Sequence, residues 1–377
     1  MAAAVLAVTA CGASACSGDS ATVQPAPDAG AGVPTILATT GIWGDVVANV
    51  ACGGLAEVET IIPVGGDPHG YEPSLQDRAR MESAALVVAN GLLLEEGLVD
   101  TLEAVAESGT PVFELAEGMD TFPYSFQGAH EGHDHDEDSH EDDHDDHEGH
   151  DHDDEAHEDD HEGHDHDEDS HEDDHDDHEG HDHDDEAHED DHDDHEGHDH
   201  SGDDPHVWFD PHRVSEALPA LAQALKTSAG LDPAAVDACL ASYQAELDAV
   251  DAEIAAMVEQ VPAESRKLVT NHEALAYFAD RYGFEVIGTV IPTPASMAQA
   301  SPAQLEELAE IIEHEGVKAL FAETVHSTDD VEALASRVGD VEVVTLYTGS
   351  LGPPGSGADT YIGFLRTNTE LIVDALD

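Results

Sequence analysis

Short apolar runs rich in β-branched residues alternate with amphipathic segments along most of this chain, and no other feature constrains its fold more strongly. One series of these segments spans residues 35–115, and a second spans residues 267–376. Alternation of this kind is typical of βαβ units arranged around a mostly parallel sheet. The pattern therefore predicts an α/β fold with two lobes, each containing a mostly parallel sheet of four strands.

The boundaries of these elements follow from the same periodicity. The expected strands cover residues 35–40, 58–63, 85–89 and 111–115, then 267–271, 285–291, 317–322 and 341–347. The expected helices cover residues 43–52, 75–83 and 95–108, then 273–282, 301–315, 329–338 and 360–376. Ser301 followed by Pro302 is a favourable helix start, because serine caps the first turn and proline fits its first position.

A helical stretch separates the two series. Residues 211–260 are dominated by Ala, Leu, Glu and Asp, with a break near Gly230. Asp232 is suited to cap a second helix that begins at Pro233 and continues to about residue 260. Such a helix would be roughly 40 Å long at 1.5 Å per residue, and we expect it to join the two lobes as a rigid connection.

The alternation is interrupted by a segment that cannot form a core. Residues 130–160 recur without change at 161–191, and a partial third copy covers 192–200. The segment holds 22 of the 28 histidines and 40 of the 87 acidic residues, and alanine is its largest apolar residue. Without apolar surface to bury, it cannot offset the entropy lost on ordering. We therefore expect a disordered His/Asp/Glu-rich insertion.

The beginning of the chain resembles the end of a lipoprotein signal peptide. A short apolar run leads to Ala10 and Cys11, and Cys11 is the residue expected to carry the lipid; a Ser/Gly/Pro-rich linker follows. No later stretch approaches 18 consecutive apolar residues. The predicted organisation is a signal peptide and linker over 1–33, an N-terminal lobe over 34–129, the insertion over 130–200, the return to that lobe and the long helix over 201–262, and a C-terminal lobe over 263–377.

The charge of the chain excludes nucleic acid as a partner. The formal net charge is -77, and outside the insertion 47 acidic residues still face 10 basic ones. Such a surface repels phosphate groups, and no basic cluster could bind them. Two further cysteines, Cys52 and Cys239, would mature in an oxidising compartment. They form either a disulfide or two buried thiols, and the sequence does not decide between these.

Outside the insertion six histidines remain, and three of them lie in turn-rich sequence or directly after an expected strand: His69, His206 and His272. A fourth polar group, Asp359, lies in a Gly-rich turn after the last expected strand. Ligands of open α/β sheets bind beyond the carboxyl ends of the strands, so facing lobes could bring these four groups together. Three imidazoles and a carboxylate suit tetrahedral Zn²⁺, and four protein ligands leave no position for a reacting water. This predicts a binding site and not an enzyme.

The segments around these residues resemble a known family. The sequences GGDPHGYEPS, DPHVWFDP, NHEALAYFADRYG and GADTY are similar to those of the metal-specific solute-binding proteins of ABC transporters, in particular the zinc-uptake branch. The resemblance implies two pseudo-symmetric lobes, the ligands His69, His206, His272 and Asp359, and delivery of metal to a membrane permease. Manganese members carry a carboxylate at the position of His272, so a nitrogen ligand there favours zinc.

Two other residues could assist the predicted site. Glu323 closes an expected strand at the same edge of the sheet, and we expect it to orient a ligating imidazole or to pair with a nearby cation. His326, three residues further on, is an alternative ligand or an outer partner of the site. His212 and His314 lie on charged helix faces, and we expect both to be solvated.

The insertion is predicted to hold auxiliary weak zinc sites or to act as a solvated acidic spacer. Its HEDDH sequences match a zinc-protease pattern, but that motif requires a stable helix and a third ligand. Deleting residues 129–201 should leave the tight site in place. The clearest candidates for the weak sites are His130, His133, His135, His147, His150, His152, His195, His198 and His200.

The leading functional hypothesis is therefore a lipid-anchored, extracytoplasmic and monomeric zinc-binding protein that delivers Zn²⁺ to an ABC permease. A manganese or iron carrier of the same family is the nearest alternative. A metal-buffering or adhesion lipoprotein would use the same site without a transporter.

Overall fold

The computed structural model describes residues 32–123, 202–291 and 300–377. Two predictions, the signal peptide with its lipidated Cys11 and the insertion at 130–200 with its auxiliary histidines, lie outside these residues. Within the described residues no helix is both long and apolar enough to cross a membrane.

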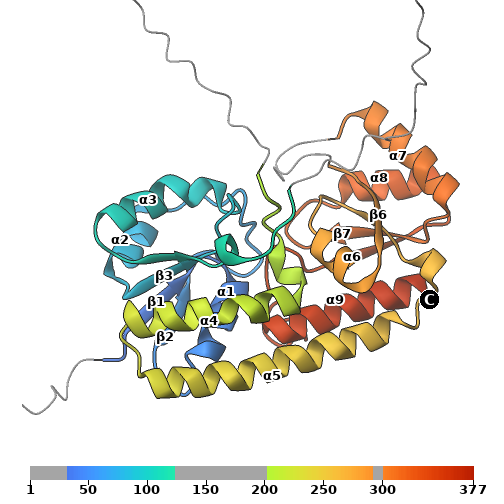
Figure 1. Ribbon diagram of the computed structural model, residues 1–377. Coiled ribbons are helices and arrows are strands. Elements are labelled where there is room, and N and C mark those ends of the chain that lie inside the picture. The colour runs from blue at the N-terminus through green and yellow to red at the C-terminus, as the bar shows by residue number, and fades with distance from the viewer. Residues whose placement is uncertain (1–31, 124–201, 292–299) are drawn as a thin grey trace, which may run out of the picture. The chain divides into compact units, whose positions relative to one another are not determined.

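Two parallel four-stranded sheets form the two lobes, as the sequence predicts (Figure 1). The first has the strand order β2-β1-β3-β4 and the second the order β6-β5-β7-β8, so the two lobes share one topology. The strands of the first sheet are β1 (Thr35–Ala38), β2 (Glu57–Thr60), β3 (Leu86–Ala89) and β4 (Val112–Glu114). Those of the second are β5 (Lys267–Thr270), β6 (Glu285–Thr289), β7 (Ala319–Glu323) and β8 (Glu342–Leu346).

Helices cover both faces of each sheet, which explains why the central strands are apolar throughout. In β1, Ile36 and Ala38 belong to one core cluster, whereas Leu37 belongs to another on the opposite face. The same alternation divides Phe321 from Leu320 in β7. A strand buried on both faces needs apolar residues at every position, as parallel sheets require.

The helices of the lobes agree closely with the sequence pattern. In the first lobe they are α1 (Gly41–Val50), α2 (Leu75–Ser83) and α3 (Val99–Glu107), and in the second α6 (Ala276–Tyr282), α7 (Pro302–Glu315), α8 (Asp329–Val338) and α9 (Tyr361–Leu376). Ser301 caps α7 through the backbone N–H of Gln304, as predicted. The predicted helix over 95–108 is shorter, because residues 96–98 form a separate 3-10 turn before α3 begins.

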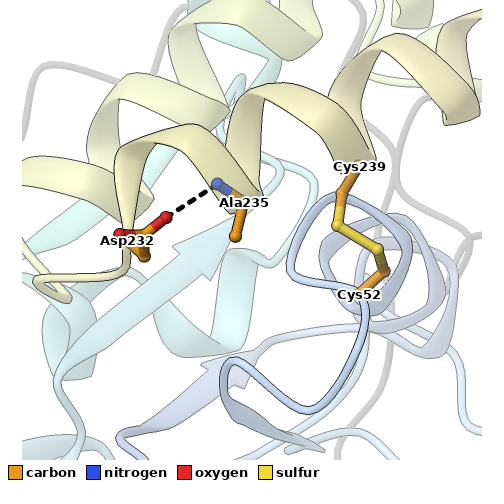
Figure 2. The surroundings of a disulfide bond; sticks show 4 residues. All are labelled: Cys52, Asp232, Ala235 and Cys239. Atoms are coloured by element: carbon orange, nitrogen blue, oxygen red, sulfur yellow. Dashed lines mark hydrogen bonds between the residues drawn. A yellow bond between two sulfur atoms is a disulfide. The ribbon is translucent and has the colours of Figure 1, made fainter.

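A helical hairpin connects the lobes. It consists of α4 (Pro211–Thr227) and α5 (Pro233–Val258), and α5 runs alongside both lobes (Figure 1). The side chain of Asp232 accepts a hydrogen bond from the backbone N–H of Ala235 at 2.8 Å, which confirms the predicted cap (Figure 2). One apolar cluster includes residues of α1, α4, α5 and α9, so the core is continuous across the connection.

Cys52 and Cys239 form a disulfide, a question that the sequence left open (Figure 2). Cys52 follows α1 in the first lobe and Cys239 lies in the second turn of α5, with their Cα atoms 5.8 Å apart. The bond joins residues separated by 187 positions in the chain. It therefore links the first lobe covalently to the connecting helix.

Candidate metal centre

Three histidines converge from separate segments of the chain. His69 lies in the loop between β2 and α2, His206 precedes a 3-10 turn (Val207–Phe209) that leads into α4, and His272 follows the end of β5. All three are buried, with exposed fractions of 7%, 1% and 2%. The positions of His69 and His206 after Pro68 and Pro205 fix the backbone that carries each ring.

The ring nitrogens of these histidines lie at the spacing of metal ligands. Nε2 of His206 is 3.2 Å from Nε2 of His69 and 3.1 Å from Nε2 of His272. One ligand atom from each histidine lies within 4.8 Å of the other two. Ligands bonded at 2.0–2.1 Å in a tetrahedron are about 3.3 Å apart, so these two separations match edges of a zinc tetrahedron.

Carboxylates orient two of the three rings in the same way. Oδ1 of Asp204 accepts from the backbone N–H of His206 at 2.9 Å and lies 2.7 Å from its Nδ1. Oε1 of Glu323 accepts from the backbone N–H of His272 at 3.1 Å and lies 2.5 Å from its Nδ1. A carboxylate at Nδ1 keeps the proton on that nitrogen, which leaves the Nε2 lone pair for a metal ion.

Burial and neighbouring charges shift the pKa values of the site in different directions. Burial lowers the pKa of His69 well below its usual value, and the nearby His206 and His272 lower it further. Burial also lowers the pKa of His272, but the charge and hydrogen bond of Glu323, together with the charges of Asp67 and Asp204, outweigh burial and raise the pKa overall. For Glu323 itself, burial raises the pKa, and the adjacent imidazole more than compensates and lowers it to about 2. The carboxylate is thus held ionised beside the imidazole of His272.

Further hydrogen bonds connect the site to both lobes. Nε1 of Trp208 donates to the carbonyl of Thr348 at 3.0 Å, and the hydroxyl of Thr348 donates to Glu323 Oε2 at 2.5 Å. The side chain of Asn90, after β3, donates to the carbonyl of Pro205 at 3.1 Å. The segment that carries His206 is therefore fixed against the first lobe by Asn90 and against the second by Trp208.

A narrow cavity, with no room for a water molecule, lies beside the three imidazoles. Its walls come from both lobes and include the loop after β7 and the residues after β8. The lining residues are Asp67, Pro68, His69, His206, Trp208, His272, Val325, His326 and Gly349.

Asp359 does not join the histidines, so its prediction as the fourth ligand is wrong. Its carboxylate is exposed, and Oδ2 accepts from the backbone N–H of Gly355 at 2.8 Å within the same turn. Burial raises the pKa of Asp45 on α1, and the charge of Asp359 raises it further, which places Asp359 near that helix. The chain lines the cavity earlier, shortly after the end of β8, at Gly349. Gly349 has no side chain that could bind a metal ion.

The other predicted residues lie as follows. Glu323 is the last residue of β7 and contacts His272, and His326 lies in the next loop and lines the cavity. His212 and His314 are exposed, as expected. Asp204 was not predicted from the sequence: the tripeptide Asp-Pro-His that contains it occurs three times, ending at His69, His206 and the exposed His212, so the motif alone does not identify its role.

The chain is similar to proteins named for metal binding and metal uptake. A family model described as the periplasmic zinc-uptake complex component A matches residues 36–375. The zinc-binding protein TroA of Treponema pallidum is 35% identical over 177 residues, a stretch that covers 46% of this chain and 57% of that protein. The matched stretch thus spans little more than half of that relative.

Other relatives are named for different metals. The manganese-binding lipoprotein MntA of Halalkalibacterium halodurans is 23% identical over 344 residues, covering 90% of this chain and 88% of that protein. Among solved structures, periplasmic TroA of Treponema pallidum has a TM-score of 0.65 at 25% identity and covers 92% of this chain and 99% of its own. A manganese-bound periplasmic protein of Candidatus Liberibacter asiaticus has a TM-score of 0.64 at 20% identity. The match covers 91% of this chain and 100% of that protein, which shows the shared fold.

Proposed function

The chain belongs to the family of the periplasmic zinc-uptake complex component A, and on this basis we propose that it captures Zn²⁺ outside the cytoplasm and delivers it to an ABC permease. Members of this family are substrate-binding components of metal transporters and not enzymes, and a membrane permease is their partner. The observation that carries the choice of zinc is the convergence of three Nε2 atoms, two of them on rings held by carboxylates.

Metal binding in this site requires only small adjustments of the protein. The rings are already buried and close together, so little ordering accompanies binding and the enclosed ion loses contact with water. Asp204 and Glu323 raise the basicity of the ligands that they hold. Release then requires separating segments from the two lobes, and docking on the permease is the event expected to do this.

The donor type favours zinc over manganese. Imidazole nitrogens suit Zn²⁺, whereas Mn²⁺ favours carboxylate and carbonyl oxygens. Relatives named for manganese and iron make a manganese or iron carrier the second candidate. A metal-buffering or adhesion lipoprotein with the same site is a third, and loss of zinc-limited growth on deleting the gene would distinguish a transport role from it.

Two parts of the proposal concern residues outside the described ranges. We propose that Cys11 carries the lipid that anchors the protein, which acts as a monomer. We also propose that the histidines of the insertion at 130–200 bind additional zinc weakly and raise its concentration near the site.

Elemental analysis and calorimetry of the purified protein test the proposal. The metal-free full chain should bind one Zn²⁺ tightly and Mn²⁺ or Fe²⁺ more weakly, with a further weak class that disappears when residues 129–201 are deleted. His272→Ala should abolish the tight class, because it removes one of three converging ligands. His212→Ala, which changes an exposed histidine on α4, is the matched control and should leave it intact. Tighter binding of Mn²⁺ than Zn²⁺ would overturn the choice of zinc.

A further inference from the structure

Three imidazoles leave one position of a zinc tetrahedron to be filled. The ring nitrogens of His69, His206 and His272 converge, and the other residues that line the adjoining cavity are the nearest candidates for the fourth ligand. Asp359 is directed elsewhere, and Gly349 contributes no side chain to the cavity. The identity of the fourth ligand decides whether the site is closed and which metal it prefers.

Few lining residues can supply a ligand atom. Pro68, Val325 and Gly349 have no suitable side-chain donor, and the indole N–H of Trp208 is directed to the carbonyl of Thr348. Two residues remain, Asp67 and His326. Oδ1 of Asp67 accepts from the backbone N–H of His69 at 3.0 Å, so this carboxylate already stabilises the turn that carries a ligand.

His326 has the features of a ligand without its metal. Its side chain is only 10% exposed, and its Nε2 is buried without a hydrogen-bond partner among the described residues. The nearest carboxylate oxygen, Oε2 of Glu323, is 3.8 Å from that nitrogen, too far for a hydrogen bond, and already accepts from Thr348. A buried nitrogen without a partner is unfavourable, and coordination to a metal ion would satisfy it.

The position of His326 agrees with this role. It lies in the short loop between β7 and α8, three residues after Glu323, and its ring centroid is 5.4 Å from that of His272. Ligand atoms of His326, His272 and Glu323 all lie within 4.8 Å of one another. The backbone N–H of Thr324 donates to the carbonyl of Leu346, which fixes the start of the loop against β8. Since this group does not include His69 and His206, binding of one ion by all four histidines requires the side chain of His326 to move towards them.

We propose that His326 is the fourth protein ligand, so that Zn²⁺ is held by four imidazoles. This inference rests on the proposed zinc function and concerns the same site. Four nitrogen ligands close the coordination sphere, which leaves no position for a reactive water. An all-nitrogen set also disfavours Mn²⁺, which prefers oxygen ligands, so His326 determines specificity as well as affinity.

X-ray absorption spectroscopy of the full chain tests this directly. The metal-free protein is loaded with half an equivalent of Zn²⁺, so that only the tightest site fills and the histidines of the insertion do not contribute. The wild type should show four imidazoles. His326→Ala should show three imidazoles and one oxygen, with affinity for Zn²⁺ lowered at least tenfold, since a carboxylate that merely orients a ligand is worth roughly that much. The preference for Zn²⁺ over Mn²⁺ should fall as well.

Three controls keep the outcomes distinct. His314→Ala removes an exposed histidine and should leave four imidazoles, and Asp67→Asn should leave them too. His326→Asn retains a polar side chain of smaller size and should show the same loss if His326→Ala unfolds. Three imidazoles and one oxygen in the wild type, unchanged in His326→Ala, would overturn the inference while leaving zinc capture intact. Absence of any tight zinc in the wild type would instead overturn the proposed function and this inference with it.

Discussion

The two lobes share one strand order, and each buries a glutamate at the carboxyl edge of its third strand, but the pKa values of the two glutamates are shifted in opposite directions. Glu95, after β3, accepts from the hydroxyl of Thr39 at 2.5 Å and from the backbone N–H of Asn90 at 2.9 Å. Burial raises its pKa, and these uncharged donors do not compensate. Glu323, at the end of β7, faces His272, and its pKa is lowered to about 2.

The difference shows how one topology can support two roles. In the first lobe the buried carboxylate stabilises a turn in which Leu92 and Leu93 adopt positive φ angles of 54° and 58°, a conformation that costs free energy for non-glycine residues. In the second lobe the carboxylate contacts the ring of His272 directly. The shared fold supplies a buried position at the sheet edge, and the residue that faces this position determines its chemistry.

The lobes also differ in how they are attached to α5. The first lobe is joined to it by the disulfide between Cys52 and Cys239. The second is joined by ion pairs, from Arg281 on α6 to Asp251 and from Arg366 on α9 to Glu253. A covalent bond constrains the unfolded chain, whereas ion pairs near the surface contribute little and respond to salt and pH.

The largest expected effect follows from removing the covalent attachment. Cys52→Ser with Cys239→Ser should lower the free energy of unfolding by about 2–5 kcal/mol, because the bond closes a loop of 187 residues in the unfolded state. Denaturant unfolding at neutral pH measures this change. Zinc affinity should stay within about threefold of the wild type, since neither cysteine contacts the site. An unchanged unfolding midpoint would show that the bond does not stabilise the first lobe against α5.

The fold was largely predictable from the sequence, for a physical reason. Strands buried on both faces must be apolar throughout, and the helices between them must show a 3.6-residue period, so both leave a clear pattern. The Asp232 cap and the Ser301 cap were predicted for similar reasons, because local hydrogen bonding determines them. The disulfide was not predictable, since no local pattern reports the distance between two residues 187 positions apart.

The candidate site was predictable only in part. Pro68 and Pro205 mark turns that carry His69 and His206, and His272 follows a clear strand, so local signals identified all three. Asp359 was misplaced because a Gly-rich turn resembles a strand end, although β8 ends at Leu346 and the chain then passes the cavity at Gly349. The contact of Asp204 with His206 depends on side-chain direction, which sequence spacing alone does not give.

A smaller effect separates the two buried glutamates. Glu323→Gln should weaken zinc binding by about 10–100-fold, or 1.4–2.7 kcal/mol, because the ring of His272 loses its charged partner. Glu95→Gln should change the affinity by less than about threefold, since the carboxylate of Glu95 accepts from Thr39 and Asn90 and from none of the three histidines. Competition with a chelator of known affinity measures both variants. An equal loss of zinc affinity in Glu323→Gln and Glu95→Gln would mean that the two buried glutamates contribute to metal binding in the same way, and the contrast drawn between the lobes would be wrong.

The smallest expected effect concerns the ion pair that attaches the second lobe to α5. Burial raises the pKa of Asp251, but hydrogen bonds from Arg281 and Tyr282 outweigh burial and lower it overall. A carboxyl group whose pKa is lower in the folded than in the unfolded protein stabilises the fold at pH values above its unfolded pKa of about 3.9. This stabilisation is lost as the pH falls through the pKa of the folded state.

Asp251→Asn should therefore lower the free energy of unfolding by about 0.5–1 kcal/mol at pH 7, and the difference from the wild type should shrink as pH falls below about 4. Denaturant unfolding at a series of pH values measures it. Asp248→Asn, an exposed change on the same helix, serves as the control and should have no comparable pH dependence. A difference for Asp251→Asn that persists undiminished below pH 3 would mean that side-chain packing, and not charge, attaches this lobe to α5.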